Sequence, residues 1–173
     1  MVGCRSLREW SLPSAWTLLP LRLVLGAGFL LHGMAKLNRG PANFALLLEH
    51  IGAPFPMFAA WMVTCVEILG GTLLIIGFLV AIVSVPLIVS MLVALFSLHI
   101  HYGFSSVNTL GVTQSGPVFG PPGYEINLLY IAGLIALALS HPTAISVDQM
   151  LFRQKTAPGA TGRENPNEPA RTI

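Results

Sequence analysis

The feature that most constrains this chain is an almost unbroken apolar run from Met57 to Ile100, whose only formal charge is Glu67. A helix rises about 1.5 Å per residue, so crossing a hydrocarbon core of about 30 Å takes roughly 20 apolar residues. The run is roughly twice that length. Because lipid offers no partners for exposed backbone groups, the run must fold back as a helical hairpin. We predict its turn at residues 77–84, with Pro86 in the first turns of the following helix.

Composition indicates that lipid is the main solvent of the chain. Of its 173 residues, 54% are hydrophobic and only 9% are charged, too few charges to cover a soluble surface of that size. The predicted fold class is all-α, a bundle of four transmembrane helices in a single domain at residues 16–150. The four predicted spans lie at residues 16–37, 57–78, 82–101 and 125–140.

The segments outside the spans are shorter and more polar. Residues 1–15 are predicted to be a cytoplasmic leader, and the first apolar segment a retained helix, because it lacks a clear small-residue cleavage site. The first outer loop carries a short amphipathic piece, Phe44 to Ile51. Residues 102–123 are uncharged and rich in Gly, Ser and Pro, which predicts an irregular connection at or above the membrane surface. Residues 151–173 are polar, and we expect a disordered cytoplasmic tail.

Basic residues indicate the orientation. Those near the two ends of the chain outnumber those on the opposite side, where only Lys36 and Arg39 flank a span. Positive charges favour the cytoplasmic side, so both termini are predicted to be cytoplasmic, in a multi-pass protein of the cell inner (plasma) membrane. Aromatic residues fit two membrane boundaries, with Trp10 and Trp16 at one and the following residues at the other: Trp61, Tyr102 and Tyr124.

Charge and cysteine usage exclude several other classes. The net charge of +2 comes from basic residues scattered through both ends, so nucleic-acid binding is not expected. Cys4 and Cys65 form no CxxC or CxxCH motif and no zinc-like spacing, so neither a disulfide framework nor a metal site is expected. The sequence also has no haem-ligand pair placed across facing helices and no flavin or nicotinamide fingerprint, which leaves the cofactor unknown.

Ionisable residues inside the spans carry the most information, because a charge at the bilayer centre costs roughly 2.5 to 3.5 kcal/mol and needs a partner or a water-filled site. The candidates are Arg22, His32, Lys36, Glu67, His99, His101 and Glu125. At about 100° per residue, they share helix stripes with small residues, which mark close helix packing. These stripes are Arg22, Gly26, Phe29, Gly33 and Lys36; Ala60, Thr64, Glu67, Gly71 and Leu74; and Glu125, Leu129, Ala132 and Ala136.

Depth in the membrane brings most of these residues together. Under the predicted topology they lie in the outer leaflet or a few turns below its surface. Helical periodicity favours His101 over His99 as the histidine of the third span that faces them. Arg22 lies apart, nearer the cytoplasmic half, where it could snorkel inward or reach toward Glu67. The sequence therefore predicts a polar pocket that opens to the outer face and is lined by Glu67, Glu125, His32, Lys36 and a third-span histidine.

Two interpretations of this cluster stay open. A buried acid and a buried base could neutralise each other and fix the helix packing without any chemistry. Alternatively, Glu67 lies in an otherwise apolar hairpin, where a carboxylate can relay protons. Lys36, at a helix end, is more typical of an interfacial anchor than of a catalytic amine.

Five short motifs follow one another along the chain. They are RLVLGAGFLLHGMAKL from Arg22 to Leu37, EILGG from Glu67 to Gly71, H-x-x-x-G-F from His99 to Phe104, G-Y-E from Gly123 to Glu125, and S-V-D from Ser146 to Asp148. In order and spacing they resemble the DoxX family of small four-helix membrane proteins, over about residues 21–148. The family's third-helix histidine matches His99, so the resemblance implies His99 at the pocket in place of His101. Helices often loosen in their last turn, where extrapolated periodicity is least reliable.

The resemblance implies a link to membrane redox chemistry. The family is named for a subunit of an archaeal thiosulfate:quinone oxidoreductase, and some bacterial members are linked to oxidative-stress complexes. The chain would then be a subunit or accessory of a quinone-linked redox system, with a quinone or similar apolar ring in the outer-leaflet pocket. Whether it is itself an enzyme stays open. The residues implied are Glu67, His99 and Glu125 as candidates for proton exchange, and Arg22, His32, Lys36 and Tyr124 in the pocket and its ion pairs.

Two other functions stay open. A non-catalytic membrane partner or scaffold for other proteins fits the absence of any cofactor motif. Glu67 at depth also allows proton or small-molecule transport, although four short helices would need to form a homo-oligomer for it. The expected partners are therefore the lipid bilayer and either redox proteins or further copies of the chain.

Overall fold

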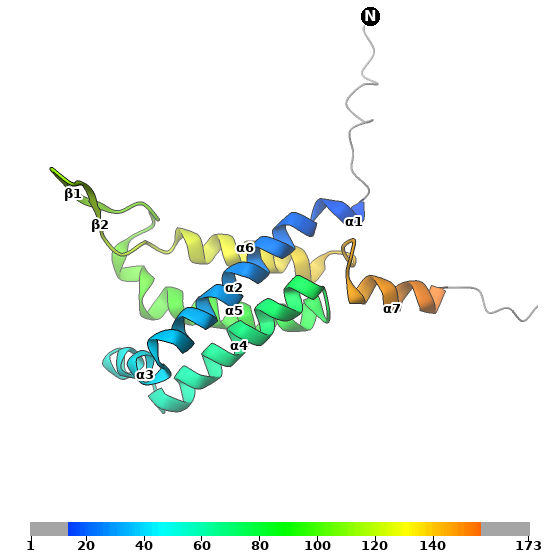
Figure 1. The fold of residues 1–173 in the computed structure, drawn as a ribbon, viewed down its shortest axis with the longest axis horizontal. Helices are drawn as coiled ribbons and strands as arrows, with labels where there is room; N and C mark the ends of the chain where they lie inside the picture. The colour runs from blue at the N-terminus through cyan, green and yellow to red at the C-terminus, as the bar shows by residue number, and fades with distance from the viewer. Residues whose placement is uncertain (1–13, 157–173) are drawn as a thin grey trace, which may run out of the picture.

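The computed structural model describes residues 14–156 and is mostly helical (Figure 1). Its elements, in chain order, are α1 (Ser14–Thr17), α2 (Leu19–Arg39), α3 (Pro41–His50), α4 (Pro56–Ile76), α5 (Val80–Ser97), the 3₁₀ turn η1 (His99–Tyr102), β1 (Thr109–Thr113), β2 (Gly116–Phe119), α6 (Glu125–Leu139) and α7 (Val147–Thr156). Most of the expected leader and tail lies outside the described residues. Residues 151–156, assigned to the disordered tail from the sequence, are helical and belong to α7.

Three helical segments are long and apolar enough to cross a membrane, namely Ala15–Arg39, Pro56–Ile76 and Val80–Ser97. α6 is also apolar but has only 15 residues, which corresponds to a rise of about 22 Å. The prediction of a mostly helical chain with several apolar helices is therefore confirmed.

A tight turn joins α4 to α5 inside the range predicted from the sequence. Gly77 adopts a left-handed conformation, with φ of 70°, which glycine takes without strain. Its N–H donates to the carbonyl oxygen of Leu74 at 3.1 Å, and the N–H of Phe78 donates to that of Leu73 at 3.0 Å. This pair of bonds is the Schellman pattern that ends many helices. The long apolar run thus folds as a helical hairpin.

α2 and α4 pack with their backbones in close contact. A Cβ added at Gly71 would lie 2.5 Å from the backbone nitrogen of Leu30 and 2.7 Å from the carbonyl oxygen of Gly26. Such an approach requires glycine on the facing helices. Apart from the half-buried Lys36, every residue of the two stripes predicted on these helices is buried. Both stripes are therefore packing faces, as the sequence predicts.

The apolar core lies between α2, α4, α5 and α6. Its largest fully buried apolar side chains are Phe29, Leu74, Leu87 and Leu134. On α6 the predicted packing stripe is wrong, because Leu129 is 63% exposed and Ala132 and Ala136 are exposed as well. Every side of α6 is apolar, so the spacing of small residues could not single out the buried face. The residues that α6 buries are Asn127, Gly133, Leu134 and Leu137.

The connection at residues 102–123 contains an antiparallel β-hairpin, which the sequence analysis did not expect. Thr109 pairs with Phe119 and Thr113 with Gly116, with an irregularity after Thr109. Figure 1 shows the hairpin projecting from the end of the bundle where α3 also lies, whereas α1 and α7 lie at the opposite end. We call these two ends of the bundle the hairpin end and the α7 end.

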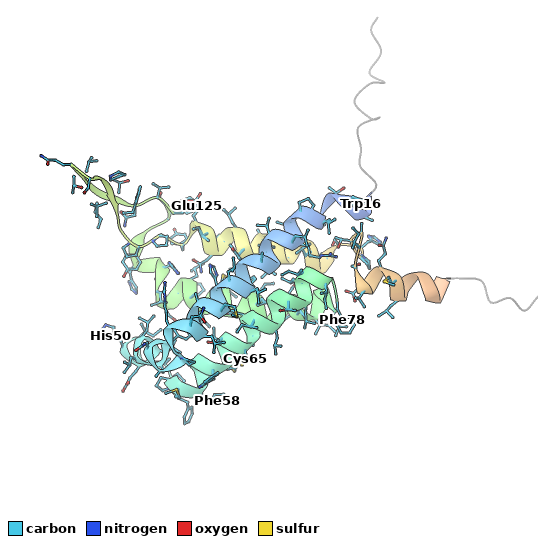
Figure 2. All side chains as sticks on the ribbon, in the orientation of Figure 1. Trp16, His50, Phe58, Cys65, Phe78 and Glu125 are labelled. Atoms are coloured by element: carbon cyan, nitrogen blue, oxygen red, sulfur yellow. The ribbon has the colours of Figure 1, made fainter. Side chains whose placement is uncertain are left out.

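Figure 2 shows aromatic side chains toward both ends of the bundle. Phe58 and His50 lie toward the hairpin end, and Trp16 and Phe78 lie toward the α7 end. Trp16 is 45% exposed and Phe58 is 69% exposed. Aromatic residues near both ends of the apolar helices are typical of membrane proteins, where they sit at the two interfaces.

Candidate functional site

A cavity of about 510 Å³ opens between α2, α3, α4, α5 and the start of α6. Small-molecule sites in proteins commonly have volumes of roughly 300–1,000 Å³. Most of the lining is apolar, from residues such as Leu47, Leu48, Val63 and Met91. Its polar members are His32, Lys36, Arg39, Asn43, Glu67, Ser90, Ser97, His99, Asn127 and Tyr130. An apolar cavity with a few polar groups is the usual form of a site for a small organic ligand.

Lys36 and Glu67 form an ion pair in the wall of this cavity. The Glu67 side chain is 2% exposed and the Lys36 side chain 24% exposed, so the acid is buried and the base reaches toward the cavity. Lys36 Nζ also lies 5.1 Å from the ring centroid of Phe44, in a cation–π arrangement. The ammonium thus joins α2, α3 and α4 and contacts protein groups, in contrast to the interfacial anchor considered from the sequence.

His99 lies in the lining and is held in a defined orientation. Its Nδ1 lies 2.9 Å from the carbonyl oxygen of Pro122. A carbonyl oxygen only accepts hydrogen bonds, so Nδ1 carries the hydrogen of this contact. α5 ends at Ser97 and the chain tightens into η1 at His99, which breaks the 100° periodicity. For this reason His101, favoured by periodicity, is exposed and outside the lining.

An aromatic wall continues the site from His32. The rings of His32 and Tyr130 are stacked, with centroids 6.0 Å apart and planes inclined by 23°. Phe29 meets Tyr130 edge to face behind them, at 5.3 Å and 86°. Aromatic faces of this kind pack well against a flat ring.

Two polar residues of α6 in the lining were missed by the sequence reasoning. Asn127 is 5% exposed, and its Nδ2 donates to the carbonyl oxygen of Met91 at 3.4 Å. Tyr130 follows it by three residues, on the same face as the buried Leu134 and Leu137. This spacing of Asn127, Tyr130, Leu134 and Leu137 is the signal that could have found them.

Glu125 and Tyr124 do not line the cavity, in contrast to the prediction that they belong to the pocket. Glu125 Oε2 accepts hydrogen bonds from the backbone N–H of Ser106 at 2.9 Å and from its hydroxyl at 2.7 Å. The Tyr124 ring meets Phe104 edge to face at 5.5 Å. Both residues therefore hold the base of the hairpin connection at the start of α6, where Figure 2 marks Glu125.

Arg22 lies at the α7 end and does not reach Glu67. It is 1% exposed and donates to Thr143 Oγ1 at 2.5 Å, to the carbonyl oxygen of Ile145 at 2.9 Å and to that of Ile75 at 3.3 Å. Its Nε has no partner among the described residues. Arg22 thus joins α2, the end of α4 and the segment before α7, a structural role distant from the cavity.

The carboxylate of Asp148 also forms hydrogen bonds at the α7 end. Asp148 of α7 accepts hydrogen bonds from the backbone N–H groups of Leu79 at 2.9 Å and Val80 at 3.1 Å. These are unpaired donors at the start of α5, which a side-chain oxygen normally satisfies. Asp148 therefore caps α5 from a distant part of the chain.

The cavity can bind and orient an apolar ring and exchange protons with it. Between residues 14 and 156, no three His, Cys, Asp or Glu side chains group closely enough to hold a metal ion. Cys65 is exposed on the outside of α4, and Cys4 lies outside the described residues. The groups that can exchange protons at the cavity are the two imidazoles of His32 and His99 and the Glu67 carboxyl.

Comparisons with known proteins agree with this architecture. The DoxX family model matches residues 17–100, which include five ionisable residues of the cavity: His32, Lys36, Arg39, Glu67 and His99. The chain is also similar to Rv3486, an uncharacterized membrane protein of Mycobacterium tuberculosis. The two are 32% identical over 151 residues, which cover 81% of this chain and 84% of that protein. No solved structure matches the chain significantly.

Proposed function

This chain is an integral membrane protein of the DoxX family, and from that premise we propose that it binds a quinone or a similar apolar ring compound in its cavity. It would do so as a subunit or accessory of a redox system in the plasma membrane. The observation that carries the proposal is the position of His99, which lines an apolar space of ligand size and is held there by the contact of its Nδ1 with the carbonyl oxygen of Pro122. Ring oxygens of quinones take up and release protons when they are reduced and oxidised, and a fixed imidazole can exchange those protons.

Four spans with both termini in the cytoplasm form part of this proposal. The short α6 would be the fourth crossing, and basic residues flank the α7 end at Arg153 and Lys155. The hairpin end then faces outward, and the cavity lies in the outer leaflet, where lipid-soluble rings partition. A ligand could reach the cavity from the bilayer without crossing water.

The Lys36–Glu67 ion pair changes the role expected for Glu67. A carboxylate oxygen bonded to an ammonium is less available to a ligand than one without a partner. We therefore give proton exchange to His99 first, and to Glu67 the role of holding Lys36 in the wall of the cavity. Glu125, bonded to Ser106, has no direct part in this proposal.

The test is quinone binding and reduction by the purified chain in lipid nanodiscs, with a soluble quinone and a series of candidate reductants. We expect His99→Ala to lower quinone turnover at least tenfold. A complete loss of general acid–base catalysis costs about 10²-fold or more. His101→Ala is the matched control, since His101 is exposed and outside the lining. Wild-type binding and turnover in both His99→Ala and Glu67→Gln would remove these residues from the mechanism.

A second function, docking of another protein, is favoured by the hairpin. Its apolar side chains are highly exposed, with Leu110 at 68%, Val112 at 79% and Phe119 at 61%. Exposed apolar side chains on a projecting hairpin are typical of interaction surfaces. Pull-down in mild detergent with the wild type and with Leu110→Ser/Val112→Ser tests it, and a wild-type chain that always purifies alone would count heavily against it.

A further inference from the structure

The ionisable groups that line the cavity are unequal in sign. Within residues 14–156 they are His32, Lys36, Arg39, Glu67, His99 and Tyr130, which makes four bases, one acid and a phenol. The ion pair between Lys36 and Glu67 removes one charge of each sign. Arg39 therefore leaves the lining with a net positive charge when both histidines are neutral.

Three of the bases follow one line along α2. His32, Lys36 and Arg39 are spaced by four and three residues, which places them on one face of the helix, and all three line the cavity. Arg39 is the last residue of α2, and its carbonyl oxygen accepts a hydrogen bond from Asn43 Nδ2 at 2.7 Å. Its guanidinium forms no ion pair with any described residue. Among residues 14–156, the lining thus offers at Arg39 an always-charged donor group with no acid paired to it.

The rest of the lining is largely apolar and aromatic. Leu48 and Met91 are buried, and the His32–Tyr130 stack adds a flat aromatic face. A neutral ring would gain contact with the apolar wall but would leave the guanidinium unused, whereas an anion would gain both contacts.

We propose that the cavity holds its ring compound as an oxyanion, that is, as a phenol, quinol or hydroxyquinone whose ring oxygen is ionised. This inference rests on the proposed function and specifies the form of its ligand. The apolar body lies between α3 and α5, and the ring oxygen lies toward the guanidinium of Arg39. On binding, the O–H bond of the ring hydroxyl breaks and its proton leaves to solvent, so no electron is transferred. Charge-assisted hydrogen bonds from the guanidinium hold the resulting oxygen.

The experiment uses the full chain in nanodiscs of neutral lipid and an alkyl-substituted nitrophenol, whose anion has its own visible absorption band. A pH titration gives the pKa of the probe bound to the protein and of the same probe in empty nanodiscs. We expect the protein to lower the probe's pKa by about one unit, which corresponds to about tenfold preference for the anion. Arg39→Gln should abolish most of this preference, and Arg39→Lys should retain part of it.

Control variants and a neutral quinone separate the outcomes. Arg153→Gln removes one positive charge from α7 and should leave the probe's pKa shift unchanged. A bound probe whose pKa is unchanged or raised, while a neutral quinone still binds, would overturn the oxyanion inference and leave the proposed function standing. A shift that survives in Arg39→Gln would also overturn it, as would displacement of the probe by a fatty carboxylate but not by ring compounds. Failure of both the nitrophenol and the quinone to bind would overturn the proposed function itself.

Discussion

Arg22 of α2 donates a hydrogen bond to Oγ1 of Thr143, a residue 121 positions further along the chain, in a buried contact. Two further donations, to the carbonyl oxygens of Ile75 and Ile145, make this guanidinium the junction of three segments at the α7 end. A buried guanidinium with several acceptors stabilises the fold only when each of its hydrogen bonds keeps its geometry. Neither a lysine nor an apolar side chain can donate to the same acceptors. Arg22 therefore joins three segments at this end, where Asp148 also links α7 to the start of α5.

We expect Arg22→Lys and Arg22→Met each to destabilise the protein by about 3 kcal/mol. Hydrogen bonds to a charged group contribute about 1.5–3 kcal/mol each, and the acceptors left buried add to the loss. The measurement is the unfolding midpoint in mixed detergent micelles. Arg39→Gln, which removes an exposed arginine from the same helix, should leave the midpoint unchanged, and equal effects of the two substitutions would contradict the role of Arg22.

Asp148→Ala should destabilise the protein by about 1–2 kcal/mol, the usual effect of losing a helix cap. The carboxylate satisfies the N–H groups of Leu79 and Val80, which the neighbouring turn leaves without helical partners. Asp148→Asn keeps an acceptor oxygen and should recover at least part of the stability. Hydrogen exchange of the Leu79 and Val80 amides checks the mechanism directly, since their protection should fall in Asp148→Ala and stay normal in Gln149→Ala.

Gly71→Ala should force α2 and α4 apart, because the added methyl group meets backbone atoms of Leu30 and Gly26 that cannot rotate away. Overpacking of this kind costs typically 1–3 kcal/mol, and here both neighbours are backbone, so we expect the upper end of that range. Gly111→Ala is the matched control, since nothing lies within 4 Å of its added Cβ. Thermal unfolding of both variants in the same detergent decides between a packing role and a general effect of removing glycine.

Removing one partner of the Lys36–Glu67 ion pair should destabilise the protein by different amounts, depending on which partner is removed. Lys36→Met leaves a carboxyl that is 2% exposed without its partner, and we expect a loss of about 3 kcal/mol, the lower end of the range for breaking a buried pair. Glu67→Gln should cost less, because Lys36 is 24% exposed and its ammonium can turn to solvent. The double variant Lys36→Met/Glu67→Gln should recover much of the loss. Additive losses in this double-mutant cycle would show that the two side chains are not coupled.

The parts of the fold that could be predicted from the sequence are those that the bilayer itself restricts. Backbone groups in lipid must bond internally, so the apolar run around Glu67 had to become a helical hairpin. On α2 and α4, ionisable residues are expensive to expose to lipid and small residues let the backbones approach closely, so their stripes correctly mark the packing faces. The same reasoning brought Lys36, Glu67 and His32 to one end of the bundle, where the structure places the cavity.

The remaining features depend on contacts that helical periodicity does not encode. His99 faces the cavity because the chain tightens into η1, a local change that an extrapolated α-helix ignores. Glu125 turns outward because the Ser106 backbone and hydroxyl offer it two donors from an irregular segment. Arg22 finds its partners in the segment before α7, and Asn127 lies on a helix that is apolar on every side. In each case, tertiary contacts determine where the side chain lies.

The length of α6 has a consequence for the membrane around the protein. α2 and α4 each contain 21 residues and rise about 32 Å, whereas α6 rises about 22 Å. In the four-span arrangement, a bilayer thick enough for α2 and α4 exceeds α6 by about 9 Å, and the acyl chains beside α6 must shorten or tilt to cover the difference. Phospholipids with shorter acyl chains should therefore gather beside α6, and the stability of the fold should depend on the thickness of the host bilayer.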